Sequence, residues 1–305
     1  MKNMQVRIRR VPDGLPTPDA FELVEAPRPA IGPGQILCRA RWLSLDPALR
    51  LQTGRVLAAR AVAEVVESRN DVFTEGECVE LEHGLQLLHV SDGSHAHRLR
   101  PGQNPPSIAL GALGRPGMTA YFGLLDVARL QPRETVLVSD VAGAAGAMAG
   151  QIAMLHGARA IGIAGSKAAC DWAVKSARFS ACINYRADKL SERLRALVPN
   201  GADIYFDSTG GELLRTIVGG KHLAPHGRVV SCVDPPPRAN GAAVLPVNVD
   251  QYEQRRDEFL KEAIPWFGEG LLVHREDVAD GLHNAPVQLC RALRGETFGK
   301  PLVKV

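Results

Sequence analysis

Apolar residues follow two different patterns along the chain, and the change falls near Gly117. Before that point, short apolar runs at 35–38, 61–66 and 78–81 alternate with turns that contain glycine and proline. Short runs bounded by turn residues are typical of strands. The N-terminal part therefore predicts a small antiparallel β domain.

Beyond Thr135, runs typical of buried strands alternate with stretches of helical periodicity. This alternation predicts a parallel, doubly wound α/β sheet. A further amphipathic helix is expected over 251–268, whereas the apolar segment 300–305 stands apart from the alternation. The expected strands are 135–139, 159–163, 181–184, 202–206 and 227–232, and the expected helices are about 144–156, 167–176, 188–197 and 211–220.

A run of small residues joins the first of these strands to its helix. Gly143 and Gly146 fit the second and third glycines of G-x-G-x-x-G, which admit a pyrophosphate and let the helix pack closely on the strand. Ala144 and Ala145 would open a helix whose free N–H groups attract phosphate. Val141 replaces the first glycine, so the motif is incomplete. A small-residue helix packed on a sheet, without a ligand, remains an alternative.

The segment after the second strand bears on the choice of cofactor. NAD-binding proteins usually carry an acidic residue there for the ribose 2′-hydroxyl. This chain has Gly165, Ser166 and Lys167 instead, with no carboxylate. A hydroxyl beside a cation favours a 2′-phosphate, and hence NADP. The alternative is that Ser166 only caps the helix and Lys167 is solvated.

The composition excludes several classes of partner. The chain has 305 residues, enough for two domains, and its net charge of +3 is too small to indicate a nucleic-acid surface. No run approaches the ~20 apolar residues of a membrane span. The basic N-terminus is followed by Val11-Pro12-Asp13-Gly14 where a signal peptide would be apolar. We therefore expect a cytoplasmic protein without nucleic-acid or membrane partners.

The cysteines and histidines do not predict a metal site. The 6 cysteines are scattered at positions 38, 78, 170, 182, 232 and 290, with no C-x-x-C spacing. We interpret them as buried free thiols rather than zinc ligands. His95 and His97 would share one face of a strand, but no third ligand lies nearby in sequence.

Motifs spread over nearly the whole chain resemble the prostaglandin reductase / leukotriene B4 12-hydroxydehydrogenase branch of the medium-chain dehydrogenase/reductase superfamily. Bacterial curcumin reductase-like oxidoreductases belong to the same zinc-independent branch. The motifs that carry the resemblance are Leu43-Ser44-Leu45-Asp46-Pro47, Val65-Val66-Glu67-Ser68, Pro116-Gly117-Met118-Thr119-Ala120-Tyr121-Phe122-Gly123-Leu124, Ala142-Gly143-Ala144-Ala145-Gly146, Gly150-Gln151-Ile152-Ala153, Tyr205-Phe206-Asp207, Gly210-Gly211-Glu212, Phe298-Gly299-Lys300 and Leu302-Val303-Lys304-Val305.

The resemblance implies a fold, an activity and a domain division. A GroES-like substrate domain would comprise residues 1–118 and 275–305, with a Rossmann NADP-binding domain inserted at 119–274. The implied reaction is the NADPH-dependent reduction of the carbon–carbon double bond of an α,β-unsaturated carbonyl compound, without zinc. The substrate would be a small molecule or carrier-bound, and the enzyme usually a homodimer.

Several positions depart from the family pattern. The lysine that binds the cofactor 2′-phosphate falls at Ala169, two residues after Lys167, whereas the matching tyrosine is kept as Tyr185. Two family asparagines are replaced by Ser208 and Thr297. The expected cofactor-binding residues are Gly143, Ala144, Ala145, Gly146, Ser166, Lys167, Tyr185, Ser208, Cys232 and Thr297.

The pocket lining departs further. Aromatic residues of the family pocket fall at Ala48, Leu85 and Leu88, and the segments 51–59 and 233–243 are shortened. These changes predict a more open, less aromatic site. The loop also lacks the family's tyrosine, so no catalytic residue is assigned.

Two residues and one alternative function stand beside this interpretation. Tyr121 is a candidate for a direct role in the reaction, but a tyrosine in such a helix is more often a core residue. Arg50 is a candidate contact to the substrate or to a phosphate, and the alternative is a solvated or domain-bridging arginine. Because several cofactor contacts are changed, there is an alternative function. The protein would then be a catalytically weakened or inactive member of the family that still binds the nucleotide and acts as a binding or structural subunit. The expected dimer would pair the edge strands at 244–249 of two copies. Pro246 weakens this expectation, because proline cannot donate a backbone hydrogen bond to the partner strand.

Overall fold

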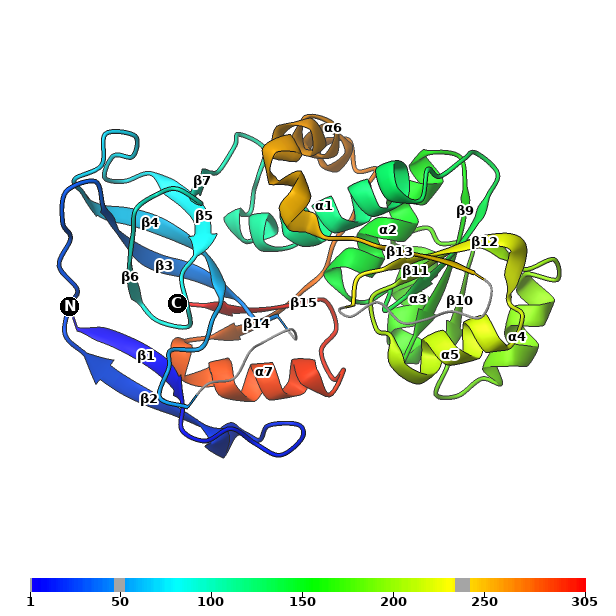
Figure 1. The fold of residues 1–305 in the computed structure, drawn as a ribbon, viewed down its shortest axis with the longest axis horizontal. Helices are drawn as coiled ribbons and strands as arrows, with labels where there is room; N and C mark the ends of the chain where they lie inside the picture. Colours follow the sequence, from blue (N-terminus) through cyan, green and yellow to red (C-terminus); the bar gives the residue numbers. More distant parts are fainter. Residues whose placement is uncertain (1, 47–52, 234–241) are drawn as a thin grey trace. The chain divides into compact units, whose positions relative to one another are not determined.

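The computed structural model describes residues 2–46, 53–233 and 242–305. The chain divides into two compact units, Met1–Leu110 with Glu276–Val305, and Gly111–Arg275 (Figure 1). The sequence-based division placed the boundaries at 118/119 and 274/275. The roles assigned to the two parts, substrate binding and NADP binding, stay predictions.

The first unit is built mainly from β structure. Its larger sheet has the order β14-β15-β3-β4-β5-β7, with β6 paired to β3, and β1 and β2 form a separate antiparallel pair. The strands are β1 (Asn3–Ile8), β2 (Phe21–Ala26), β3 (Ile36–Ser44), β4 (Arg60–Ser68), β5 (Cys78–Glu82), β6 (Leu88–Ser91), β7 (His97–Arg98), β14 (Glu276–Asp280) and β15 (Lys300–Lys304), and the helices are η1 (Pro18–Ala20), η2 (Pro106–Leu110), η5 (Leu282–Asn284) and α7 (Ala285–Leu293).

The C-terminal strand returns to the N-terminal sheet, as predicted. β15 pairs antiparallel with β3, and Leu302 lies opposite Ser44. It pairs in parallel with β14, so this sheet is not wholly antiparallel.

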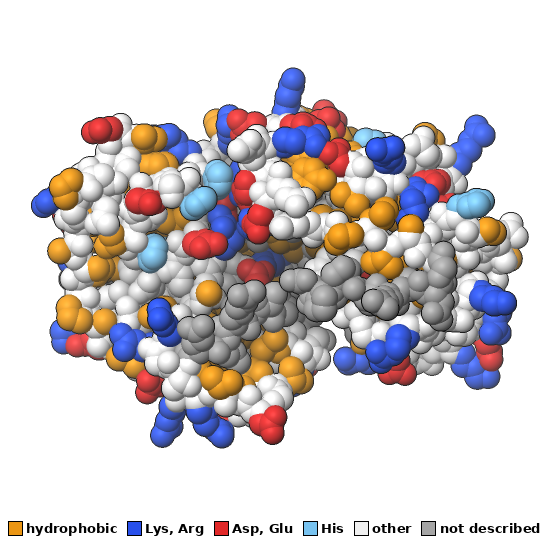
Figure 2. All heavy atoms as spheres, viewed as in Figure 1, with side chains coloured by type: hydrophobic (Ala, Val, Ile, Leu, Met, Phe, Trp, Pro, Cys, Tyr) orange, Lys and Arg blue, Asp and Glu red, His pale blue; other side chains and the backbone are white. Residues whose placement is uncertain are grey.

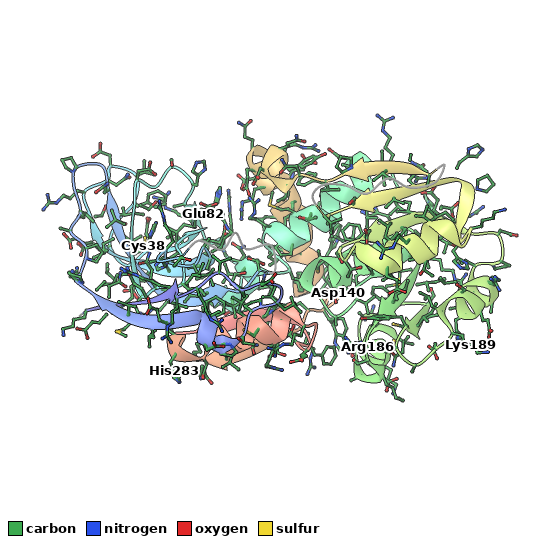
Figure 3. All side chains as sticks on the ribbon, turned by 60° about the horizontal axis from the view of Figure 1, so that its bottom comes forward. Cys38, Glu82, Asp140, Arg186, Lys189 and His283 are labelled. Atoms are coloured by element: carbon green, nitrogen blue, oxygen red, sulfur yellow. The ribbon has the colours of Figure 1, made fainter. Side chains whose placement is uncertain are left out.

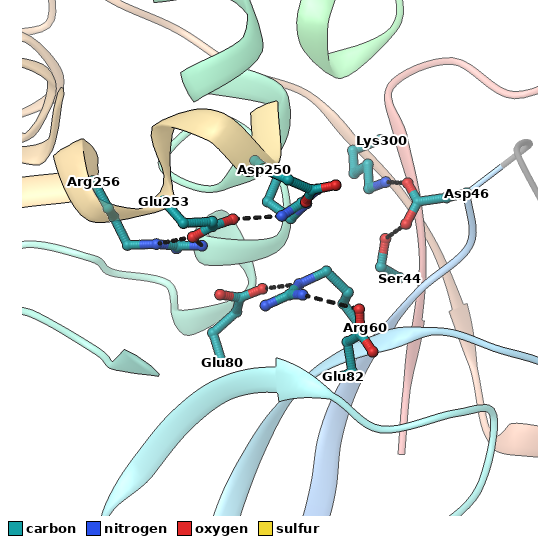
Figure 4. A network of polar contacts seen from close by, with 10 residues as sticks. Ser44, Asp46, Arg60, Glu80, Glu82, Asp250, Glu253, Arg256 and Lys300 are labelled. Atoms are coloured by element: carbon teal, nitrogen blue, oxygen red, sulfur yellow. Dashed lines mark hydrogen bonds and ion pairs between the residues drawn. The ribbon is translucent and has the colours of Figure 1, made fainter. Parts of the chain in front are cut away.

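The Asp46 carboxylate accepts hydrogen bonds from Ser44 and from Lys300, whose side chain is 6% exposed (Figure 4). Burial alone would raise the pKa of Asp46, but Lys300 and the hydrogen bonds outweigh it and hold that pKa below its usual range.

The second unit is the predicted parallel α/β sheet. Its strand order is β10-β9-β8-β11-β12-β13, and every neighbouring pair is parallel. The strands are β8 (Thr135–Ser139), β9 (Arg159–Ala164), β10 (Ala181–Asn184), β11 (Ala202–Asp207), β12 (Leu223–Ser231) and β13 (Ala243–Pro246), and the helices are α1 (Arg115–Phe122), η3 (Gly123–Val127), α2 (Ala144–Leu155), α3 (Lys167–Lys175), α4 (Leu190–Leu197), α5 (Gly211–Gly219), η4 (Val249–Arg255) and α6 (Arg256–Gly268).

The helix expected over 251–268 is two elements. A 3₁₀ segment, η4, precedes α6, and the Asn248 side chain accepts a hydrogen bond from Asp250 N–H at the start of η4. Phe259 is fully buried on α6, and Tyr252 of η4 stacks on Phe122 with ring centroids 4.4 Å apart. The amphipathic pattern was therefore interpreted correctly, but the change of helix type was not.

The surface carries both signs of charge. Figure 2 shows Lys and Arg side chains interspersed with Asp and Glu on the face in view, as the small net charge predicts. None of the helices in the described part of the chain is both long enough and apolar enough to cross a bilayer.

Candidate cofactor site

The carboxyl ends of the parallel strands place most of the predicted cofactor residues at one edge of the sheet. Because all neighbours in the order β10-β9-β8-β11-β12 are parallel, the segments that follow them lie at the same edge. The order reverses at β8, between β9 and β11, which is the position where doubly wound sheets bind ligands. The residues that follow these strands are Gly143 to Gly146 after β8, Ser166 and Lys167 after β9, Tyr185 after β10, Ser208 after β11 and Cys232 after β12.

Close packing at the start of α2 requires glycine. Gly143 is the N-cap of α2, and among the described residues no side-chain cap bonds to the first turn of this helix. A Cβ added to Gly146 would lie 2.4 Å from the carbonyl oxygen of Asp140 and 2.5 Å from that of Ser139. The helix therefore lies directly against the end of β8, and its N-terminal N–H groups are available to an anion.

Asp140 is a feature of this loop that sequence reasoning missed. It adopts φ +52°, a left-handed conformation, and a Cβ added to Gly143 would lie 2.1 Å from its Oδ2. Although the residue keeps exposed surface, desolvation of the carboxylate raises its pKa, and the Gly143 N–H lowers it by less. A carboxylate here opposes the binding of a phosphate when it is ionised.

The structure gives Ser166 and Lys167 ordinary structural partners. Ser166 caps α3, and its Oγ accepts from the Ala169 N–H at 3.2 Å. Lys167 Nζ donates to Asp171 Oδ2 at 2.6 Å, one turn further along the helix. Ala169, where the family lysine falls, is 3% exposed. The alternative of a cap beside a surface lysine therefore has direct support.

A second cation, Arg186, lies closer to the turn after β9. A Cβ added to Gly165 would lie 3.2 Å from the Tyr185 hydroxyl and 3.3 Å from Arg186 Nε. The Arg186 guanidinium carbon is 5.8 Å from the centre of the Tyr185 ring, and Arg186 is labelled in Figure 3. Sequence reasoning found Tyr185 but missed Arg186, although it is the next residue along the chain.

Ser208 and Cys232 lie at the centre of the same edge. Ser208 N–H donates to Ser139 Oγ at 2.9 Å, and Ser208 Oγ donates to the Ser139 carbonyl at 3.2 Å, which ties the ends of β8 and β11 together. Cys232 N–H donates to the Asp207 carbonyl, and burial raises the pKa of its thiol to about 12. Burial therefore disfavours the thiolate, which is the nucleophilic form of Cys232.

Asp207 is fully buried at the end of β11. Its Oδ1 accepts from the Tyr205 hydroxyl at 3.0 Å and from the Gly210 N–H at 2.9 Å. Its Oδ2 is a buried oxygen with no hydrogen-bond partner within the described part of the protein. A ligand group that donates a hydrogen bond would satisfy it.

Other sequence candidates lie elsewhere. Thr297 stands between α7 and β15, in the first unit, and Arg50 lies outside the described residues. Tyr121 is 4% exposed; burial, followed by the charge of Glu262, raises the pKa of its phenol well above the usual value. Tyr121 is thus a core residue.

The expected histidine pair needs correction, and so does the placement of Leu85 and Leu88 at a pocket wall. His95 lies in a turn rather than in β7, so it does not share a strand face with His97. Leu85 and Leu88 are 0% and 1% exposed in packed apolar clusters of the first unit. They fill its core instead of opening a pocket, and Ala48 lies outside the described residues.

The cysteines also differ in part from expectation. Cys38 and Cys290 are buried free thiols, whereas the other cysteines keep partial exposure. No group of three or more His, Cys, Asp or Glu residues within 2–46, 53–233 and 242–305 is arranged to hold a metal ion.

Comparisons with known proteins agree with this architecture. Residues 4–99 match the family described as N-terminal domain of oxidoreductase, and residues 144–244 match the family described as zinc-binding dehydrogenase. Prostaglandin reductase 1 of Sus scrofa is 35% identical, with 95% of each chain covered. The NADPH-dependent curcumin reductase of Escherichia coli is 32% identical, over 96% of this chain and 94% of the relative. The structure of CurA from Vibrio vulnificus in complex with NADPH superimposes with a TM-score of 0.90 at 31% identity, over 99% of each chain.

Proposed function

Because the chain belongs to the zinc-independent branch of the medium-chain dehydrogenase/reductase superfamily, alongside the prostaglandin and curcumin reductases, we propose that it is an NADPH-dependent oxidoreductase. Its reaction is the reduction of the carbon–carbon double bond of an α,β-unsaturated carbonyl compound. The observation that carries the proposal is the arrangement at the carboxyl edge of the parallel sheet, where the glycine turn follows β8, and Tyr185 and Arg186 follow β10 and lie against the turn after the intervening strand β9.

The residues at this edge fit the parts of NADP. The N-terminus of α2 would hold the pyrophosphate, because its first-turn N–H groups have no side-chain cap. The Tyr185 hydroxyl and the Arg186 guanidinium lie together beside Gly165 and would hold the 2′-phosphate, and the sequence has no carboxylate at the end of β9. Ser166 and Lys167 would contribute from the first turn of α3.

The remaining predicted contacts act near the reactive end of the cofactor. Ser208 and Cys232 follow β11 and β12, beside the buried, partly unsatisfied carboxylate of Asp207. When bound, NADPH supplies the hydride. The chain's own part is to orient the cofactor and the substrate carbonyl and to exclude water. Thr297 is proposed as a further contact because it stands where the family pattern has an asparagine.

The substrate is proposed to be a small-molecule or carrier-delivered enone, and the protein to be a cytoplasmic homodimer. The relatives support the substrate class, since prostaglandin, curcumin and pulegone reductases are among them. The free edge of β13, among the described strands, supports the dimer.

Two measurements on the purified protein test the function. Calorimetric titration should show tighter binding of NADPH than of NADH. Stopped-flow absorbance should then show consumption of bound NADPH by enones of graded size, with saturated ketones of equal size as controls. NADPH binding without consumption by any enone would favour the binding-subunit alternative, and equal affinity for NADH would refute the NADP assignment.

A further inference from the structure

Two thiols meet at the outer end of the parallel sheet. Cys182 lies on β10, which is the terminal strand of this sheet among the described residues, and Cys170 lies on α3. Cys182 Sγ is 2.8 Å from Cys170 Sγ, and the two residues are 12 positions apart in the sequence. Both residues keep part of their surface exposed.

The positions of the two sulfur atoms favour a covalent bond. A disulfide has an S–S distance of about 2.05 Å, so the two sulfur atoms need to approach by less than about 1 Å. Their side chains come from a helix and a strand that already pack together. Neither thiol has another sulfur partner among the contacts of the described residues.

The pair also belongs to the two segments that carry the candidate 2′-phosphate residues. Cys170 N–H donates to the Ser166 carbonyl at 3.1 Å, so Cys170 stands one helical turn after the cap of α3. Cys182 stands three residues before Tyr185 and four before Arg186. A bond between the sulfur atoms would therefore join the two segments that flank Gly165.

We propose that Cys170 and Cys182 form a reversible disulfide that lowers the affinity of the protein for NADPH. The oxidant is a hydroperoxide. One thiolate attacks the peroxide oxygen and the O–O bond breaks, which gives a sulfenic acid and an alcohol or water. The second thiol attacks that sulfur, the S–O bond breaks, and water leaves. Two thiols are oxidised to one disulfide, the peroxide takes up the two electrons, and a dithiol reductant reverses the reaction.

The disulfide should form slowly and weaken binding of the 2′-phosphate in particular. Burial raises the pKa of both thiols, so little thiolate is present at neutral pH and sustained oxidant is needed. Drawing α3 towards β10 shifts Ser166 and Lys167 relative to Tyr185 and Arg186. We expect NADPH to bind at least threefold more weakly after oxidation and NADH to bind unchanged. This coupling, unlike the disulfide itself, rests on the proposed function.

Peptide mapping without reduction tests the disulfide independently of any activity. After treatment of the reduced protein with hydrogen peroxide, the peptides that contain Cys170 and Cys182 should appear as one cross-linked species, lighter by two hydrogens. Dithiothreitol should separate them. Cys170→Ser and Cys182→Ser should each abolish the cross-link, whereas Cys78→Ser, a change at a partly exposed cysteine of the other unit, should leave it intact. Sulfinic acid without a cross-link, or a cross-link to another cysteine, would overturn the proposal.

Titration of the reduced and oxidised forms with NADPH and NADH tests the coupling. The Cys170→Ala/Cys182→Ala double variant is the control, and peroxide should leave its NADPH affinity unchanged. Equal NADPH affinity of the two forms, with the disulfide proven by mapping, would overturn the regulatory role. Failure of the reduced protein to bind NADPH would instead count against the proposed function, and the mapping result would stand.

Discussion

Arg186 is the residue on which the choice of cofactor depends most. Its Nε and the Tyr185 hydroxyl lie on the same side of Gly165, while Lys167 is already paired with Asp171. We expect Arg186→Gln to weaken NADPH binding about tenfold, or ~1.4 kcal/mol, because one charge-assisted contact is lost. NADH affinity should not change, since NADH has no 2′-phosphate.

A matched substitution at the far end of α3 controls for the loss of positive charge. Lys175 is exposed at the C-terminal end of the helix, and Lys175→Gln should leave both affinities unchanged. Calorimetric titration of both variants with both nucleotides makes the comparison. An equal loss of NADPH and NADH affinity in Arg186→Gln would show that Arg186 supports the fold of the site rather than the 2′-phosphate.

Asp140 should make cofactor binding depend on pH. Desolvation already raises the pKa of its carboxyl group, and a neighbouring pyrophosphate would raise that pKa further. Binding should therefore take up a proton and become tighter as the pH falls from neutral towards the raised pKa. Asp140→Asn should bind more tightly at neutral pH, by roughly fivefold or about 1 kcal/mol, and show a flatter pH profile.

NADH is the better probe for this effect, because a 2′-phosphate titrates near pH 6 on its own account. The dissociation constant for NADH should be measured between pH 5 and 8 in the unaltered protein and in Asp140→Asn. Parallel pH profiles with equal affinities would show that the Asp140 carboxylate does not face the bound phosphates.

At the scale of elements, the contact between α2 and β8 depends on the absence of a side chain at Gly146. A Cβ there would meet backbone carbonyl oxygens at 2.4 and 2.5 Å, which cannot rotate away as a flexible side chain can. Gly146→Ala should therefore reduce the free energy of unfolding by about 1–3 kcal/mol. It should also weaken the binding of both nucleotides, because the N-terminus of α2 is displaced.

Gly219 provides the matched control in another helix. It lies at the end of α5, and a Cβ added there meets no atom within 4 Å. Gly219→Ala should leave the protein unchanged or stabilise it by up to about 1 kcal/mol, because alanine restricts the unfolded chain more than glycine does. Urea denaturation of both variants makes the test. Equal effects of the two substitutions would contradict the role given to Gly146.

The elements of the second unit were largely predictable, because each buried parallel strand is a continuous apolar run bounded by turn residues. β8 and β10 have the predicted bounds, whereas β12 begins at Leu223 instead of 227. The extra residues of β12 include the exposed Pro225 and His226, which carry no apolar pattern. The site was less predictable. The contact of Arg186 with the Gly165 turn joins two consecutive strands, and the Cys170–Cys182 contact joins a helix to the next strand. Local spacing does not encode either contact.

At the scale of the whole molecule, β13 limits how two copies could pair through this sheet. The Val247 N–H donates to the Ser231 carbonyl of β12 at 2.9 Å. In a parallel strand, alternate residues direct their backbone groups to the same neighbour. Ala242, Val244 and Pro246 therefore direct theirs to the open edge. Pro246 has no N–H to offer there, and proline is tolerated in sheets mainly on such edge strands.

A homodimer built on this edge should therefore have a short and specific ladder. If a two-fold axis passes at Val244, the two Val244 residues exchange two hydrogen bonds, and each Ala242 N–H reaches the Pro246 carbonyl of the other copy. The reverse bond from Pro246 cannot form.

We expect sedimentation equilibrium at micromolar concentration to give a dimer. Ala242→Pro should shift it towards monomer without changing the melting of the monomer, because that N–H has no partner within the chain's own ladder. A monomeric mass for the unaltered protein would refute the dimer, and a dimer unaffected by Ala242→Pro would place the interface on another surface.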